Sequence, residues 1–381
     1  MKKIVAILFL ILLVCSFNGV KNVKASTENQ KNIDYSEILD GLNLDVCEDI
    51  FKENDYFKSV NGKSIKEKIS YLIYGDADLD FFSLFRNFFN GEISSLMPLL
   101  SILFIVSVIG GMKDIVKVEN GKTSEISNFA IYLINLSVIA TCFSLVTVKV
   151  NDTVEKLTKQ SETVFPILLA LLSFCGQTYS VATFSPVMPV VAFITQKIVV
   201  GIMFPLITAL TVVNMVGNMG ESVRLNKFSE LLSSTFKWLL GLVLGIFTIF
   251  ASVKGISASK TDGISRFALR YLSGSVPLVG GFLKDGTEIF VLSASVVKNA
   301  FGKFFLFSVF FEIFKPVISL LCLSFILKIS ASLIEPFQTD KSVNLLSATA
   351  KTFTYYIAVL LTIFFIYFVL ILLIMISGGS V

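Results

Sequence analysis

The sequence predicts an all-α fold: a polytopic integral membrane protein with about eight spans, preceded by a signal peptide and a short exported helical region. Charged residues make up 16% of the 381-residue chain, whereas ordinary soluble domains carry about 25%. Hydrophobic residues make up 54% and gather in long blocks. The chain has no histidine, so it lacks the commonest general base and the commonest zinc ligand.

Residues 1–25 have the pattern of a Sec signal peptide. Lys2 and Lys3 form its basic start, the apolar run 4–14 is too short to span a bilayer comfortably, and 23–25 offers a cleavage site. An uncleaved membrane anchor is the alternative. Removing this segment takes away four lysines and cancels the formal net charge of +4. The remaining chain gives a nucleic-acid partner no electrostatic support, so none is expected.

Residues 26–92 form a separate exported region in which acidic side chains outnumber basic ones. Apolar residues recur at helical spacing in 35–42 and 65–73, which predicts short amphipathic helices. The region is small for an independent hydrophobic core. We therefore expect it to pack on the membrane domain or on a partner, and cleavage of the signal peptide places it on the extracytoplasmic side.

Residues 93–381 form the predicted multi-spanning membrane domain. A helix needs about 20 apolar residues to cross the hydrocarbon core. The 187–216 run exceeds that length and contains Pro189 and Pro205, so the interpretations are one kinked helix or two short ones. The predicted spans are 93–112, 129–149, 164–184, 187–216, 238–254, 276–297, 304–327 and 352–377.

Similar segments recur along the membrane domain and suggest internal repeats. Four predicted spans share a similar pattern led by a proline, and after three of these prolines a related segment follows at about the length of one span. Many transporters are built from duplicated helical units; chance similarity among apolar helices is the alternative. The prolines are Pro98, Pro166, Pro205 and Pro316, and the related segments begin at Glu125, Glu230 and Asn344.

Ionisable residues inside predicted spans are candidates for function, because burying a charge in a membrane is costly. Glu312 and Lys315 lie three residues apart on one face of the predicted 304–327 helix and can neutralise each other there. They either line a pore or form a structural pair against a neighbouring helix. Lys197 either lines a pore or extends to the membrane interface.

A second candidate group interrupts the predicted 276–297 span. Its charged side chains follow a proline and a pair of glycines, a pattern that favours a broken helix near a cavity. A plain loop between two shorter helices explains the pattern equally well. The residues are Pro277, Gly280, Gly281, Lys284, Asp285 and Glu288.

Gly241 and Gly245 form a GxxxG motif in the predicted 238–254 span, a spacing that permits close contact between membrane helices. The sequence has no phosphate-binding loop, zinc-ligand spacing or dinucleotide fingerprint. We therefore expect no cofactor, no metal and no catalytic residues, and an enzyme is the least favoured class.

Four segments resemble the stage III sporulation protein AE family of endospore-forming Firmicutes, and the resemblance extends over essentially the whole chain. The most specific segment is VPLVGGFLKD at 276–285. The others are FPILLALL at 165–172, SPV at 185–187 and KGIS at 254–257.

The resemblance implies a membrane component of an operon-encoded complex made in the mother cell. Such a complex lies in the membrane around the engulfed forespore and, with a forespore partner, forms a channel or secretion-like apparatus. Late forespore gene expression and forespore integrity depend on it. The alternative, supported by the repeats and the buried charges, is an independent secondary transporter or permease.

Overall fold

The computed structural model describes residues 121–218, 225–274, 280–335 and 340–377, together with isolated helical positions between 86 and 105. In these ranges the chain is helical and contains no strand. The predicted signal peptide at 1–25, nearly all of the exported region and most of the first predicted span lie outside the described residues.

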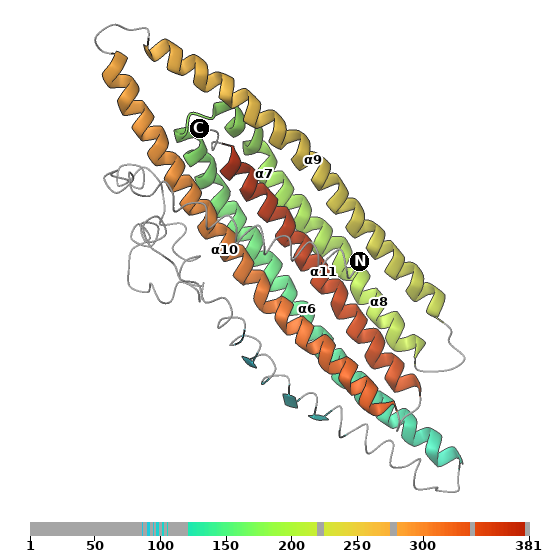
Figure 1. Ribbon diagram of the computed structural model, residues 1–381. Coiled ribbons are helices and arrows are strands. Elements are labelled where there is room, and N and C mark those ends of the chain that lie inside the picture. The colour runs from blue at the N-terminus through green and yellow to red at the C-terminus, as the bar shows by residue number, and fades with distance from the viewer. Residues whose placement is uncertain are drawn as a thin grey trace.

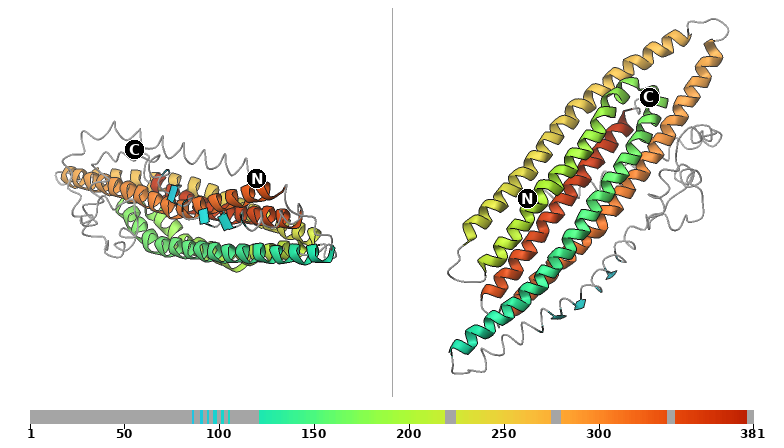
Figure 2. Two further views of the ribbon diagram at one scale, coloured as in Figure 1. Left: turned by 90° about the horizontal axis from the view of Figure 1, so that it is seen from below. Right: turned by 180° about the vertical axis from the view of Figure 1, so that it is seen from behind.

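The described helices run side by side in an elongated bundle (Figure 1). Figure 2 shows two layers, with α6, α7 and α8 in one and α9, α10 and α11 in the other. The elements are α6 (Gly121–Phe174), α7 (Thr178–Ile198), the π-helix η4 (Val199–Met203), α8 (Phe204–Gly217), α9 (Asn226–Gly274), α10 (Gly280–Ile334) and α11 (Asp340–Ile376).

Within the described ranges, five helical segments are long and apolar enough to cross a membrane. They lie in α6, in the continuous α7–η4–α8 helix, and in α9, α10 and α11. The all-α, multi-span prediction therefore agrees with the structure. The division into spans does not, because the described part of the chain has fewer and longer helices than the sequence predicted.

Helix α6 joins the predicted spans 129–149 and 164–184, whose separation was wrong. The charged segment between them stays helical because one face is apolar: Val150, Val154 and Leu157 are fully buried while the charged side chains lie on the opposite, exposed face. A helix with one apolar and one charged face can continue through a polar segment, so no loop is needed there. At 1.5 Å per residue the 54-residue helix is about 80 Å long.

Between the described helices, the first turn falls at Gly176, inside the predicted 164–184 span. Gly176 has φ +72°, a left-handed conformation that costs glycine little. Its N–H donates to the Ser173 carbonyl at 2.8 Å, and the Gln177 N–H donates to the Leu172 carbonyl at 3.3 Å. This pair of bonds is a Schellman motif, which ends α6 by satisfying its last carbonyls.

Between α7 and α8 the chain continues as one helix through a π turn, which confirms the kinked-helix interpretation of 187–216. The Phe204 N–H donates to the Val199 carbonyl, a bond one residue longer than in an α-helix. Pro205 follows directly. Proline has no N–H and its ring collides with the carbonyl four residues earlier, so a locally widened helix accommodates it.

Helix α10 joins the predicted spans 276–297 and 304–327, which was the second wrong division. Residues between those spans include Lys298 and Gly302, a combination that resembles a connection. In the structure Lys298 is fully buried, and its Nζ donates to the carbonyls of Met375 at 3.2 Å and Ser377 at 3.1 Å. A cation bonded to the last carbonyls of α11 complements the negative end of that helix.

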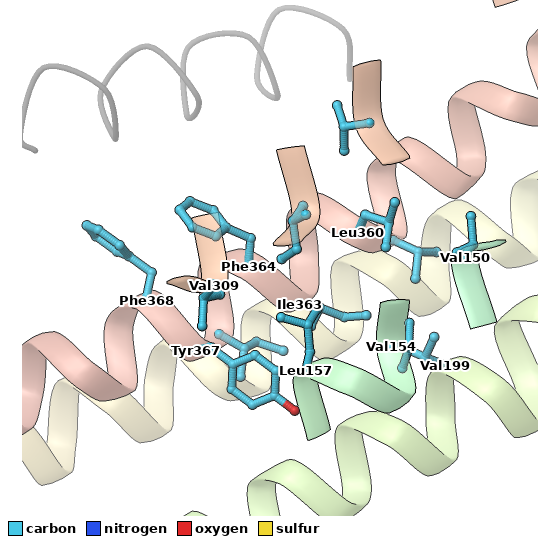
Figure 3. Close-up of a cluster of buried hydrophobic side chains, with 14 of the residues drawn as sticks. Val150, Val154, Leu157, Val199, Val309, Leu360, Ile363, Phe364, Tyr367 and Phe368 are labelled. Carbon is cyan, nitrogen blue, oxygen red and sulfur yellow. The ribbon is translucent and has the colours of Figure 1, made fainter. Parts of the chain in front are cut away.

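Helices α10 and α11 form the central antiparallel pair. Ser324 Oγ donates to the Ala350 carbonyl at 2.9 Å, and the Phe310 and Phe364 rings lie 6.0 Å apart. Going from these contacts to the Lys298 bonds, the residue numbers fall along α10 by nearly as much as they rise along α11. The two helices therefore stay in one register over this length. Figure 3 shows side chains of α6, α10 and α11 packed together in this core.

Hydroxyl groups join α11 to the other layer. Thr147 of α6 hydrogen-bonds the Tyr356 hydroxyl at 2.9 Å, and the hydroxyl of Tyr367 bonds with Thr158 and Ser161. From the first contact to the second, the residue numbers rise along both α6 and α11. The two helices are therefore parallel. Hydrogen bonds of this kind satisfy polar groups that a membrane interior would otherwise leave unpaired.

The structure agrees with one part of the proposed internal repeat and contradicts another. Pro166 and Pro316 lie inside α6 and α10, so the prediction that these prolines open spans was wrong. The three related segments, however, begin at equivalent places: Glu125, Glu230 and Asn344 are each the fifth residue of α6, α9 and α11. The superposition of 204–254 on 315–376 stays a prediction.

The α10–α11 contact gives a first testable prediction, because Gly302 has no room for a side chain. A Cβ at Gly302 would lie 2.8 Å from Met375 Cγ. We expect Gly302→Leu to lower the free energy of unfolding by about 1–3 kcal/mol through overpacking. Thermal unfolding of the detergent-purified protein measures it. Gly241→Leu is the control, since a Cβ there meets nothing within 4 Å; equal shifts for the two variants would contradict the packing.

A second prediction concerns Lys298. Lys298→Met keeps the length of the side chain but leaves terminal carbonyls of α11 unpaired, which costs about 1–3 kcal/mol. We expect a lower unfolding temperature and faster hydrogen exchange in the last turn of α11. Lys328→Met is the matched control, because Lys328 lies on the same helix with an exposed side chain. Unchanged exchange at the end of α11 in Lys298→Met would refute the role assigned to this lysine.

Candidate functional site

Two of the predicted ionisable residues lie on the sides of the bundle. Lys197 is exposed on the last turn of α7, with Nζ 5.5 Å from the centre of the Phe193 ring. Glu312 of α10 lies 4.0 Å from Lys156 of α6, and their side chains are 21% and 49% exposed. Lys315 is half-buried one turn further along α10.

The ion pair between Glu312 and Lys156 was missed from the sequence. Sequence spacing pairs Glu312 with Lys315, because only neighbours on one helix can be recognised from spacing. Lys156 lies between the predicted spans 129–149 and 164–184. The sequence analysis therefore gave no reason to expect it beside α10. The contact bridges the two layers, and the predicted pairing of Glu312 with Lys315 stays a prediction.

The second candidate group is only partly placed. Pro277 lies outside the described residues. Gly280 and Gly281 are the first residues of α10, and the three charged positions lie in its opening turns; their side chains are outside the described set. They are Lys284, Asp285 and Glu288. From Gly280 onward the structure has a continuous helix. Neither the broken helix nor the plain loop therefore occurs at the three charged positions.

The GxxxG motif faces outward in the described chain. Gly241 and Gly245 are exposed, and a Cβ at either would meet nothing within 4 Å. No described helix therefore packs on these glycines. A packing role for these glycines stays a prediction.

The most distinctive polar feature is a row of charged side chains on α6, which we name the charged stripe. Its members recur every three to four residues on one exposed face of the helix. Glu155 and Lys159 form an ion pair at 2.7 Å, with side chains 58% and 72% exposed. The stripe consists of Lys149, Asp152, Glu155, Lys156, Lys159 and Glu162.

Beside the stripe, α6, the π turn and α8 line an open groove of about 630 Å³. Asn151 and Thr147 contribute from α6, and Thr208 from α8. The amide oxygen of Asn151 is buried and has no hydrogen-bond partner among the described protein atoms. Apolar side chains form the rest of the wall: Val200, Phe204, Pro205, Ala209, Val212 and Val213. Because π turns often mark functional positions in helices, this groove belongs to the candidate site.

The available chemistry is that of paired charges, amides and hydroxyls. Among the described residues, no group of three His, Cys, Asp or Glu side chains could hold a metal ion. The free thiols of Cys142, Cys175 and Cys322 are buried, where a cysteine behaves as a small hydrophobic residue. Side chains of this kind can bind or guide hydrated solutes, or contact other proteins.

Comparison with known proteins identifies the family. The family model for stage III sporulation protein AE matches residues 64–378. Stage III sporulation protein AE of Bacillus subtilis (strain 168) is 24% identical over 262 residues, which cover 68% of this chain and 66% of that protein; the match thus spans just under two thirds of the relative. No solved structure matches. The chain belongs to the stage III sporulation protein AE family.

Proposed function

We propose that this chain is a multi-pass membrane component of the channel or secretion-like complex between the mother cell and the forespore. The observation that carries the proposal is the family match over residues 64–378, which supports a role at stage III of sporulation. The five apolar helices support a place in the membrane. In this proposal the chain lies in the mother-cell membrane around the forespore, with its N-terminal region extracytoplasmic.

The proposed partners are the other proteins of the stage III operon and a forespore-side protein. The helices favour such a role because exposed apolar side chains and the unoccupied glycine face of α9 offer surfaces for protein contact within the membrane. In the proposal the chain has no catalytic role, and its contribution is to hold or line the passage between the two cells.

An independent secondary transporter is the second proposal. The groove beside the π turn and the equivalent placement of the related segments favour it, since transporters combine repeats with locally altered helices near the substrate. Uptake of a solute by proteoliposomes that contain this chain alone would support the transporter. Dependence on partner proteins would support the complex.

The third prediction tests the sporulation role. Deletion of the gene in its own organism should leave engulfment normal, silence a reporter that is active only in the late forespore, and cause the forespore to collapse. Fluorescence microscopy with a membrane dye and the reporter measures all three. A copy of the gene expressed in the mother cell should restore spore formation, whereas normal spores in the deletion strain would remove the sporulation assignment.

The fourth prediction tests the contact between α6 and α10. Glu312→Lys places a cation beside Lys156 and one turn from Lys315, and like charges at this distance repel. We expect lower spore yield or less protein in the membrane. Adding Lys156→Glu should restore both, because the reversed pair attracts again. Glu312→Lys with Lys159→Glu is the matched control; rescue by both second changes would show that only the total charge matters.

A further inference from the structure

The charged stripe on α6 is well exposed although it lies midway along an apolar bundle. The described side chains of the stripe that form ion pairs are between 49% and 72% exposed. On the other side of the same segment, Val150, Val154 and Leu157 pack into the core shown in Figure 3. The segment therefore belongs to the folded bundle and is not a loop beyond its end.

Contacts between helices place other residues at the same height as the stripe. Tyr367 bonds with Thr158 and Ser161, which border the second half of the stripe, and Phe365 contacts Phe247 of α9. The stripe segment 155–161 is therefore level with the part of α9 around Phe247.

On the α7 side, the groove brings Asn151 beside Val200. Because α6 and α7 are antiparallel, residues 193 and 194 lie level with the middle of the stripe. The charged segment, α7 near 193 and α9 near 247 thus share one height along the bundle.

At this height α7 and α9 expose large apolar side chains. Phe193 and Ile194 are 57% and 48% exposed on α7, and Ile246 and Ile249 are 61% and 68% exposed on α9. Other exposed apolar side chains lie along both helices. The exposed Lys197 lies one turn beyond Phe193, with Nζ 5.5 Å from the centre of that ring. A mainly apolar surface of this kind suits the acyl chains of a bilayer, whereas in water it would be an unusually large apolar patch.

We infer that the α7–α9 side of the bundle faces lipid at this height, while the charged stripe faces a water-filled space at the same depth of the membrane. A stripe of charges against acyl chains would cost several kcal/mol per charge. The charges of the stripe are already matched in sign within the chain, since three are basic and three are acidic, and a pair such as Glu155–Lys159 stays hydrated. Water satisfies this face, and a partner of opposite charge is not required.

The inference rests on the proposed function in one respect. In the described part of the chain the stripe lies on the outer surface, and in our proposal other subunits of the complex close the water-filled space. α10 lies beside α6 and at the opposite edge of the bundle from α9 (Figure 1). The α6–α10 side is therefore the side that we assign to the passage. A stripe with equal numbers of basic and acidic groups implies weak selection by charge.

Thiol labelling in membranes from sporulating cells tests the inference. Single cysteines at Glu155, Lys159, Phe193 and Ile249 are introduced into a chain in which Cys15 and Cys47 are serine. The buried Cys142, Cys175 and Cys322 remain as unreactive internal standards. A membrane-impermeant maleimide is applied to opened vesicles, so that water reaches both faces of the membrane.

We expect the cysteines at positions 155 and 159 to react at least about tenfold faster than those at 193 and 249, because a thiol among acyl chains neither ionises nor meets the reagent. Equal, fast reaction at all four positions would place this height outside the bilayer and overturn the inference. Slow reaction at 155 and 159 would mean that lipid or a tightly packed protein covers the stripe, which overturns it as well.

The labelling result is independent of the sporulation assignment. Spore yield of each cysteine strain is measured beside its labelling. A deletion strain that sporulates normally would defeat the proposed function but leave the difference between the two sides of the bundle intact. A functional chain whose two sides label alike would defeat only the present inference.

Discussion

The fold depends on the antiparallel contact between α10 and α11. This pair keeps one register from Ser324–Ala350 to Lys298 at the end of α11, and α11 also contacts α6, α8 and α9. In a membrane, helices gain little from hiding apolar surface from lipid, so close packing and internal hydrogen bonds must hold them together. Gly302 permits the close approach, and buried hydroxyls and Lys298 supply the bonds.

Lys298 illustrates how polar groups are tolerated in this core. Its ammonium group meets carbonyls that α11 cannot satisfy within its own helix. This buried charge thus lies where a helix end offers partial negative charge. The position of α11 along α10 is fixed by this bond at one end and by the Ser324–Ala350 bond at the other, so sliding of either helix would break both.

The sequence was sufficient to predict an all-helical membrane protein, because the apolar composition and the length of the apolar runs follow directly from the need to cross a bilayer. It could not locate the helix ends. Segments 150–163 and 298–303 are as polar as loops, and only the structure reveals that Val154 or Lys298 turns inward. The actual turn at Gly176 lies inside an apolar run, and a single glycine is too common to mark it.

The same ambiguity limited the candidate site. Spacing on one helix suggested the pair of Glu312 with Lys315, which stays a prediction. The ion pair of Glu312 with Lys156 could not be predicted, because Lys156 belongs to a segment that had been treated as a connection. The charged residues of α6 were assigned to a connection for one reason: α6 carries its charges on one face and its core residues on the other. α6 thus has two unlike faces, whereas near Phe193 and Ile249 the exposed side chains of α7 and α9 are mainly apolar. The charged segment that hid the helix from sequence analysis is therefore also the segment on which we base the proposed distinction between a passage-facing and a lipid-facing side.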